Sequence, residues 1–209
     1  MLKIVGVGNA LVDIMTKLED DDFLNINELP KGSMQLVEAK KSADLLKAAE
    51  KLEKHQVSGG SAANTIRSLA KLGVETGFVG KLGTDTLGDF YENELKEYGV
   101  NTLMSRTETP TGTALALVSK DGERTFATHL GAAVSMLPDD LKDAEFQDYD
   151  IIYLEGYLVQ NHELLVKAAE ISKKHKLKLA IDLASYNVVE AELDFIKPFV
   201  NDHVDILFA

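Results

Sequence analysis

The chain of 209 residues contains no cysteine and no tryptophan, and it has only four prolines. Without cysteine, neither a disulfide framework nor a thiolate metal site is possible, and nothing in the composition indicates an oxidising compartment. No apolar run approaches the length of a membrane span, and the amino terminus lacks the basic segment and long apolar stretch of a signal peptide. We therefore expect a cytoplasmic protein that does not associate with membranes.

Basic residues are also scarce, since 22 of them face 34 acidic residues and give a net charge of −12. Such a charge repels phosphate backbones, so we expect no nucleic-acid partner. The acidic cluster 19–22 matches no calcium-loop spacing, and the five histidines show no spacing typical of metal ligands. No metal-ligating residue is therefore predicted.

Short apolar runs alternate with amphipathic helical stretches along the chain. This alternation predicts an α/β fold with a doubly wound, mainly parallel sheet flanked by helices, in one domain spanning residues 1–209. The expected strands are Leu2–Val7, Thr76–Val79, Ile151–Leu154, Leu177–Ile181 and Val204–Phe208. The expected helices are Ser42–Leu52, Ile66–Leu72, Asp85–Tyr98 and one that Asn161 caps.

Two segments, about 14–37 and 112–130, interrupt the alternation. The first contains the short runs Ile14–Leu18 and Met34–Val37. The second contains Gly112–Val118 and Arg124–His129, which a turn-like tetrapeptide joins. We expect these runs to form a small antiparallel β lid inserted above the ends of the main strands.

The first strand leads into a candidate ligand site. Gly6 and Gly8 begin like a dinucleotide fingerprint, but Leu11 stands where the third glycine is needed, so a nicotinamide-dependent dehydrogenase is the least favoured interpretation. Asn9 and Asp13 follow, and a carboxylate and an amide together can hold vicinal hydroxyls. Turn capping is the structural alternative for both side chains.

A second candidate site is the segment Ser58–Thr65, in which Gly59, Gly60 and Ser61 lead into a helix. Paired glycines allow close backbone approach, and Asn64 is a poor helix former inside that helix. We favour a substrate site here over a glycine turn with a serine cap. A third glycine-rich loop, Gly80–Gly88, lacks the pattern of a P-loop and is better explained by turn and cap roles for Gly83 and Thr84 or Asp85.

Acidic side chains also end two of the apolar strands, at Glu155 and Asp182. A carboxylate at such a position is costly unless it serves a polar site, so both are candidates for contacts with an acceptor or with metal-bound water. Capping of the next helix is the alternative.

In their order and spacing, these segments resemble the ribokinase/adenosine-kinase (PfkB) family, most closely its adenosine-kinase branch. The motifs that carry the resemblance read GNALVD (8–13), GGSAAN (59–64), GKLGTDTLG (80–88), PTGT (110–113) and ERTFATHLGA (123–132). Each motif is weak alone, and together they span the chain. Ile66 departs from the family's first signature, which has a small residue there.

The resemblance implies a kinase that transfers phosphate from ATP, with Mg²⁺, to a hydroxyl of a small-molecule sugar or nucleoside. It implies that Asn9, Asp13, Gly60, Ser61 and Asn64 surround the acceptor hydroxyls. Gln35 and Val37 would line the acceptor from the lid, and Arg124 would approach the transferred phosphate. A turn ion pair of Arg124 with Asp121 or Glu123 is the alternative.

The family's Asn-x-x-Glu and Gly-Ala-Gly-Asp motifs, the second of which carries the general base, would follow Ala209. No catalytic residue is therefore expected among the 209, and this part of the chain is expected to be inactive alone. Leu158 and Asn187 stand where the branch has aromatic residues, so adenosine-like and ribose- or fructose-like acceptors both remain open. A non-catalytic sugar- or nucleoside-binding module is the alternative function. A monomer and a lid-mediated homodimer are equally compatible with the resemblance.

Overall fold

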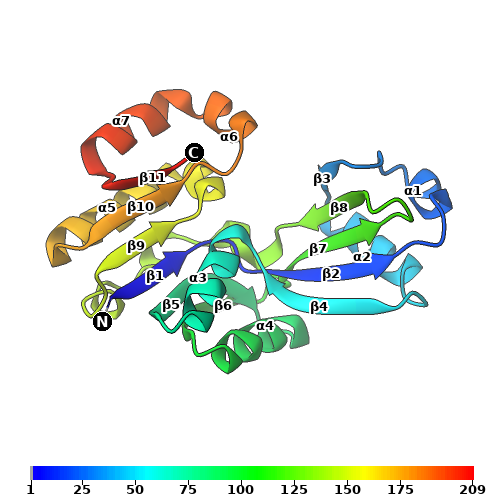
Figure 1. Ribbon diagram of the computed structural model, residues 1–209, viewed down its shortest axis with the longest axis horizontal. Helices are drawn as coiled ribbons and strands as arrows, with labels where there is room; N and C mark the ends of the chain where they lie inside the picture. The colour runs from blue at the N-terminus through cyan, green and yellow to red at the C-terminus, as the bar shows by residue number, and fades with distance from the viewer. Residues whose placement is uncertain (1) are drawn as a thin grey trace.

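Six parallel strands form the central sheet of the computed structural model, which describes residues 2–209 (Figure 1). Their spatial order is β11-β10-β9-β1-β5-β6, and every neighbouring pair runs parallel. The strands are β1 (Lys3–Val7), β5 (Glu75–Gly83), β6 (Asn101–Thr107), β9 (Ile151–Leu154), β10 (Lys178–Asp182) and β11 (Ile206–Phe208). The order reverses between β1 and β9, and ligands of doubly wound sheets bind outside the strand ends at such a reversal.

Helices cover both faces of this sheet, as predicted (Figure 1). On one face α3 (Ser61–Lys71) packs closely because Gly6 leaves room for Ile66, which is fully buried. On the other face α5 (His162–His175) packs on β9 and β10 and buries Leu165 and Ala168 in the apolar cluster there. The remaining helices around the sheet are α4 (Thr86–Glu97), α6 (Tyr186–Ala191) and α7 (Leu193–His203), with 3₁₀ turns η1 (Gly131–Ser135), η2 (Pro138–Asp140), η3 (Asp143–Glu145) and η4 (Gly156–Gln160). Of the helices described between residues 2 and 209, none is long and apolar enough to cross a bilayer.

A second sheet of five strands extends from the carboxyl end of β1 (Figure 1). Its order is β3-β8-β7-β2-β4, with β2 (Leu11–Lys17), β3 (Met34–Leu36), β4 (Lys54–Gly59), β7 (Gly112–Val118) and β8 (Arg124–His129). One face buries Ile14 and Leu115 together with Leu24 of α1 (Asp22–Ile26) and Leu45 of α2 (Ala39–Ala48). Both sheets therefore belong to one continuous packed structure.

The pairing within the second sheet corrects the expected antiparallel lid. Only β7–β8 and β2–β4 are antiparallel, whereas β2 runs parallel to β7 and β3 runs parallel to β8. The sheet also begins earlier than residue 14 and includes β4, which lies outside both expected segments. Sequence patterning missed β4 because Val57 is its only apolar residue, and it missed β6 because that edge strand is mostly polar and only half-buried.

The Asp85 carboxylate joins the central sheet to the entry of the second sheet. Oδ1 caps α4 by accepting from the Gly88 amide at 2.8 Å, as the sequence predicted, and it also accepts from Thr111 Oγ1 at 2.7 Å. Oδ2 accepts from the Thr111 amide at 2.7 Å, directly before β7. Burial opposes the charge, but hydrogen bonds from Thr111 and Gly88 outweigh it and lower the pKa of Asp85.

Substituting Asp85 by alanine should lower the free energy of unfolding by about 2–4 kcal/mol, because it removes a helix cap and two bonds to a charged acceptor. Since the pKa of Asp85 is lowered on folding, this contribution should be present at neutral pH and disappear as the pH falls through the folded value. Urea unfolding at several pH values measures both effects. Asp89→Ala, an exposed acid on the same helix, should change stability by less than about 0.5 kcal/mol, and equal losses for the two variants would contradict the assignment.

Candidate functional site

The carboxyl ends of β1 and β9 bring Asn9 and Glu155 into direct contact. Asn9 Nδ2 donates to Glu155 Oε1 at 2.7 Å, and the Ala62 amide at the start of α3 donates to Oε2 at 3.0 Å. Glu155 is only 2% exposed, and a side chain at Gly8 would collide with its carboxylate. Burial raises the pKa of Glu155, and the two donated hydrogen bonds oppose that rise. Both residues predicted to meet a ligand therefore hold each other and α3 in place.

Asp182, at the end of β10, is engaged in a similar way. Its Oδ2 accepts from Tyr153 Oη at 2.6 Å and from Ser61 Oγ at 3.3 Å, and its Oδ1 accepts from the Ala184 amide at 2.8 Å. Burial and this contact raise the pKa of Tyr153 to about 12. Asp182 thus connects β9 and β10 to the exposed Ser61 hydroxyl, and it borders a cavity of about 720 Å³ that extends to Phe208.

Asp13 differs from the other two acids because its carboxylate has no hydrogen-bond partner among residues 2–209. It lies on β2, half-buried, and leans over Gly59 of β4, where the absence of a side chain makes room for it. Burial raises the pKa of Asp13 from 3.8 to about 6, and the nearby charge of Arg67 opposes this shift. An acceptor group without a protein partner is therefore available beside a glycine-lined backbone.

The segment from Gly59 to Asn64 completes this group. Gly60 has φ of +97° and lies against the Asn9 carbonyl, a conformation and a contact that only glycine accommodates. One turn into α3, Asn64 Oδ1 accepts from Arg67 Nη2 at 2.7 Å, whereas its Nδ2 has no acceptor among the described residues. Sequence reasoning missed Arg67, and its only signal was a spacing of three residues from Asn64 on the same helix.

Strand register places Gln35 away from this group. Gln35 shares a row with Ala127, Leu115 and Ile14 on the buried face, and its amide donates to Ser33 Oγ at 3.2 Å. Val37 packs against the same core, and its carbonyl oxygen lies 3.2 Å from His129 Nδ1. Neighbouring residues of a strand point to opposite faces of the sheet. The predicted pair Gln35 and Val37 lies one position after the residues that share a face with Asp13, so it points to the opposite face.

The residues that do share a face with Asp13 are mostly apolar. Its own row continues through Ala114, Thr128 and Leu36, and the next row contains Met15, Ala116, Phe126 and Met34. We call these seven residues the apolar face of the second sheet. Met34 and Leu36 are more than half exposed. The alternation of apolar and polar residues in β3 indicates that Met34 and Leu36 share one face. It does not indicate whether that face is the one that carries Asp13.

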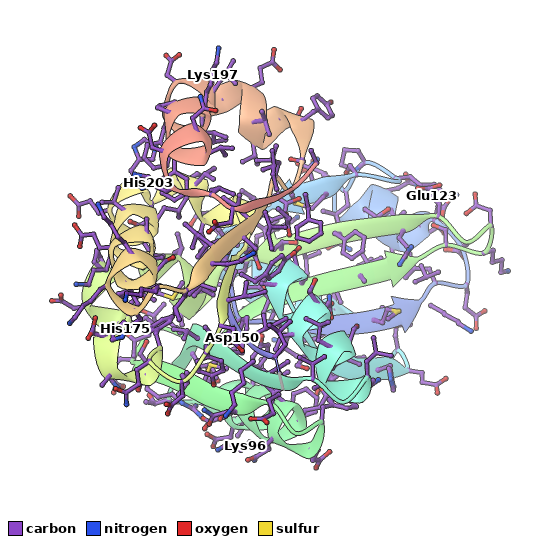
Figure 2. All side chains as sticks on the ribbon, turned by 60° about the vertical axis from the view of Figure 1, so that its left-hand side comes forward. Lys96, Glu123, Asp150, His175, Lys197 and His203 are labelled. Carbon is purple, nitrogen blue, oxygen red and sulfur yellow. The ribbon has the colours of Figure 1, made fainter. Side chains whose placement is uncertain are left out.

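Arg124 begins β8 at the outer end of the second sheet, next to Glu123, which Figure 2 labels at the tip. It shares a row with Val118 and Lys17, four residues from Asp13 along β2, which corresponds to about 13 Å of strand. Arg124 is exposed and forms no ion pair with Asp121 or Glu123; Asp121 pairs instead with Lys31 at 2.7 Å. The structure therefore does not place Arg124 beside the strand-end cluster.

Comparison with known proteins identifies the family. Residues 33–209 match the model of the pfkB family carbohydrate kinases. The chain belongs to this family. Its ribokinase-like fold agrees with solved structures, among them the adenosine kinase of Sinorhizobium meliloti, with a TM-score of 0.84, 31% identity, and coverage of 99% of this chain and 64% of that chain. A probable sugar kinase protein of Rhizobium etli CFN 42 gives a TM-score of 0.85, 30% identity, and coverage of 99% and 63%.

A curated relative covers the chain to a similar extent. The guanosine-inosine kinase of Escherichia coli strain K12 is 26% identical over 224 residues, which include 98% of this chain and 50% of that protein. The chain therefore spans about half the length of this curated relative and under two thirds of the two solved kinases. The family resemblance and the fold inferred from the sequence are both confirmed.

We expect Glu155→Ala to destabilise the protein by about 3–5 kcal/mol, because the buried Asn9 amide and the Ala62 amide lose their acceptor. Chemical denaturation followed by circular dichroism measures the loss. The matched control is Glu97→Ala, which removes an exposed acid from α4 and should change stability by less than about 0.5 kcal/mol. A loss below about 1 kcal/mol in Glu155→Ala would contradict the anchoring role.

Proposed function

We propose that this chain carries the acceptor site of an ATP-dependent kinase that phosphorylates a primary hydroxyl of a nucleoside or sugar. The observation that carries the proposal is the Asp13 carboxylate, which has no hydrogen-bond partner among residues 2–209 and lies beside Gly59 on the strand that follows β1. Membership of the PfkB family supports the reaction class.

The free groups suit hydroxyls in their chemistry. An ionised Asp13 only accepts hydrogen bonds, and Asn64 Nδ2 only donates them, so one hydroxyl can satisfy both. Gly59 makes room for the Asp13 carboxylate and Gly60 for the Asn9 carbonyl, and the exposed Ser61 hydroxyl is bonded to Asp182 nearby. Asn9 and Glu155 contribute by fixing the strand end and the start of α3.

The apolar face of the second sheet favours a nucleoside over a free sugar. A free sugar is a small ring with hydroxyls around its edge, whereas a nucleoside combines a hydroxylated ribose with a flat base that can lie against Leu36 and Phe126. Names of relatives agree with this preference, since two of them are a guanosine-inosine kinase and an adenosine kinase. We therefore propose a purine-nucleoside-like acceptor first and a ribose- or fructose-like acceptor second.

ATP enters this proposal as the phosphate donor, with Mg²⁺ accompanying its phosphates. Among residues 2–209 no three His, Asp or Glu side chains converge on a metal site, so these residues do not fit a resident ion. We propose that the second sheet acts as a lid whose closure brings Arg124 to the transferred phosphate, where a cation stabilises developing charge. The general base that takes the hydroxyl proton is proposed to lie outside residues 2–209.

An assay of ADP release tests this function on the protein expressed from its complete reading frame. We expect MgATP turnover with adenosine, guanosine or inosine, and slower turnover with ribose or fructose. Acceptor binding by calorimetry without any ADP release would support the non-catalytic binding module instead. If the protein neither bound nor phosphorylated any of these compounds, the proposed function would be excluded.

Asp13→Asn should abolish acceptor binding, because one acceptor oxygen is replaced by a donor, and should at the same time stabilise the fold. Folding raises the pKa of Asp13 to about 6, so keeping it charged above that pH costs stability that the neutral amide avoids. The expected gain is about 1–2 kcal/mol at pH 8, after allowance for partial exposure, and it should vanish below about pH 4. Calorimetry and thermal unfolding measure the two effects.

In the unsubstituted protein, acceptor affinity should fall as the pH drops below about 6, where Asp13 takes up a proton. Asp44→Asn is a matched control on the exposed side of α2 and should leave both acceptor affinity and its pH dependence unchanged. Unaltered acceptor binding in Asp13→Asn would remove Asp13 from the site.

A further inference from the structure

Arg67 of α3 forms hydrogen bonds with two residues that border the proposed acceptor site, Asn64 and Ser58. Its Nη2 donates to Asn64 Oδ1 at 2.7 Å, and its Nη1 donates to the Ser58 carbonyl at 2.7 Å and to Ser58 Oγ at 3.1 Å. Its guanidinium also lies 5.6 Å from the centre of the Tyr98 ring. One side chain thus joins the helix that carries Asn64 to the strand end beneath Asp13.

These contacts fix the direction of the Asn64 amide. A guanidinium has five N–H donors and no acceptor, so the Asn64 atom that faces it must be the oxygen. The amide nitrogen is consequently turned away from Arg67, where no acceptor among the described residues meets it. Without Arg67 the amide would be free to flip and present its oxygen, which cannot donate to an acceptor.

The charge of Arg67 acts on Asp13 as well. No carboxylate among residues 2–209 forms an ion pair with Arg67, so its charge is not neutralised by a contact. Tyr91 of α4 is the other ionisable group that interacts with Asp13, and the exposed His55 lies one row along β4. Arg67 is the one group whose charge stabilises the Asp13 carboxylate against burial.

Side chains of α4 also form hydrogen bonds with the end of β4. Tyr91 Oη donates to the Gly59 carbonyl at 3.0 Å, and the Ser58 amide donates to Glu94. These bonds fix the backbone but reach neither Asn64 nor Asp13. Among residues 2–209, Arg67 both bonds to Asn64 and acts through its charge on Asp13.

Resting on the proposed function, we propose that Arg67 is a positioning residue that makes the acceptor site selective for a hydroxyl which accepts from Asn64 and donates to Asp13. It orients the amide as a donor and keeps the carboxylate an acceptor. Arg67 itself touches neither substrate nor phosphate. Its loss should therefore change how the site binds its acceptor without changing how the protein binds ATP.

The first test needs no catalysis. In the ligand-free protein, the Asp13 carboxyl carbon is titrated by NMR in the unsubstituted protein and in Arg67→Met, Arg67→Lys and Lys71→Met. Lys71, which is also on α3, is the matched control. Its Nζ lies 4.4 Å from the centre of the Tyr98 ring, but it contacts neither Asn64 nor Ser58. Arg67→Met should titrate at higher pH than the unsubstituted protein, whereas Arg67→Lys and Lys71→Met should not. An Asp13 midpoint unmoved in Arg67→Met would overturn the proposal.

The second test is kinetic and separates positioning from a purely structural role. Arg67→Met should raise the acceptor KM on the order of 10-fold or more, leave the KM for ATP unchanged, and move the acidic limb of kcat/KM for the acceptor to higher pH. Arg67→Lys keeps the positive charge but loses the forked guanidinium donors. Its acceptor KM should therefore rise, while the acidic limb of kcat/KM should stay at the same pH. A pH-independent loss in Arg67→Met would indicate structural support only and overturn the proposal. If the unsubstituted protein lacks kinase activity, the proposed function fails, while the NMR titration still decides the effect of Arg67 on Asp13.

Discussion

The buried Glu155 carboxylate is the interaction on which the rest of the site depends. Removing a carboxylate from water is costly, and here the Asn9 amide and the Ala62 backbone amide offset that cost. The same two bonds fix the end of β1 against the start of α3, at the point where the strand order reverses. Asn9 therefore supports the strand end as well as being a predicted ligand contact.

Three acids lie near the strand ends, and their surroundings give them different chemical roles. Glu155 and Asp182 have both oxygens occupied, so they support the structure around Ser61 and Ala62. Asp13 has no partner, and burial raises its pKa instead. A group that folding leaves unsatisfied is a natural place for a ligand, because binding recovers the hydrogen bonds that burial removed.

The central sheet could be predicted from the sequence because its inner strands are apolar on both faces, as β1 and β10 show. The second sheet could be predicted only in part, since its pairing depends on tertiary contacts between segments about a hundred residues apart. The site followed the same pattern. Motifs selected Asp13 and the Gly59–Asn64 segment, which the structure brings together, but the register of β3 places Leu36 and not Gln35 on the face that Asp13 shares. Arg67 belongs to no motif, because its contact with Ser58 forms only once β4 and α3 meet.

The two free groups of the site lie on different parts of the structure, which has a mechanical consequence. Asn64 and Arg67 share α3, which packs on the central sheet, whereas Asp13 belongs to the second sheet. A hydroxyl that accepts from Asn64 and donates to Asp13 therefore bridges the two sheets. The free energy of that bridge would favour arrangements in which the sheets lie close together, so the proposed site would link acceptor binding to the position of the second sheet. A lid that closes over the acceptor needs such a link, and here a single pair of side chains can provide it.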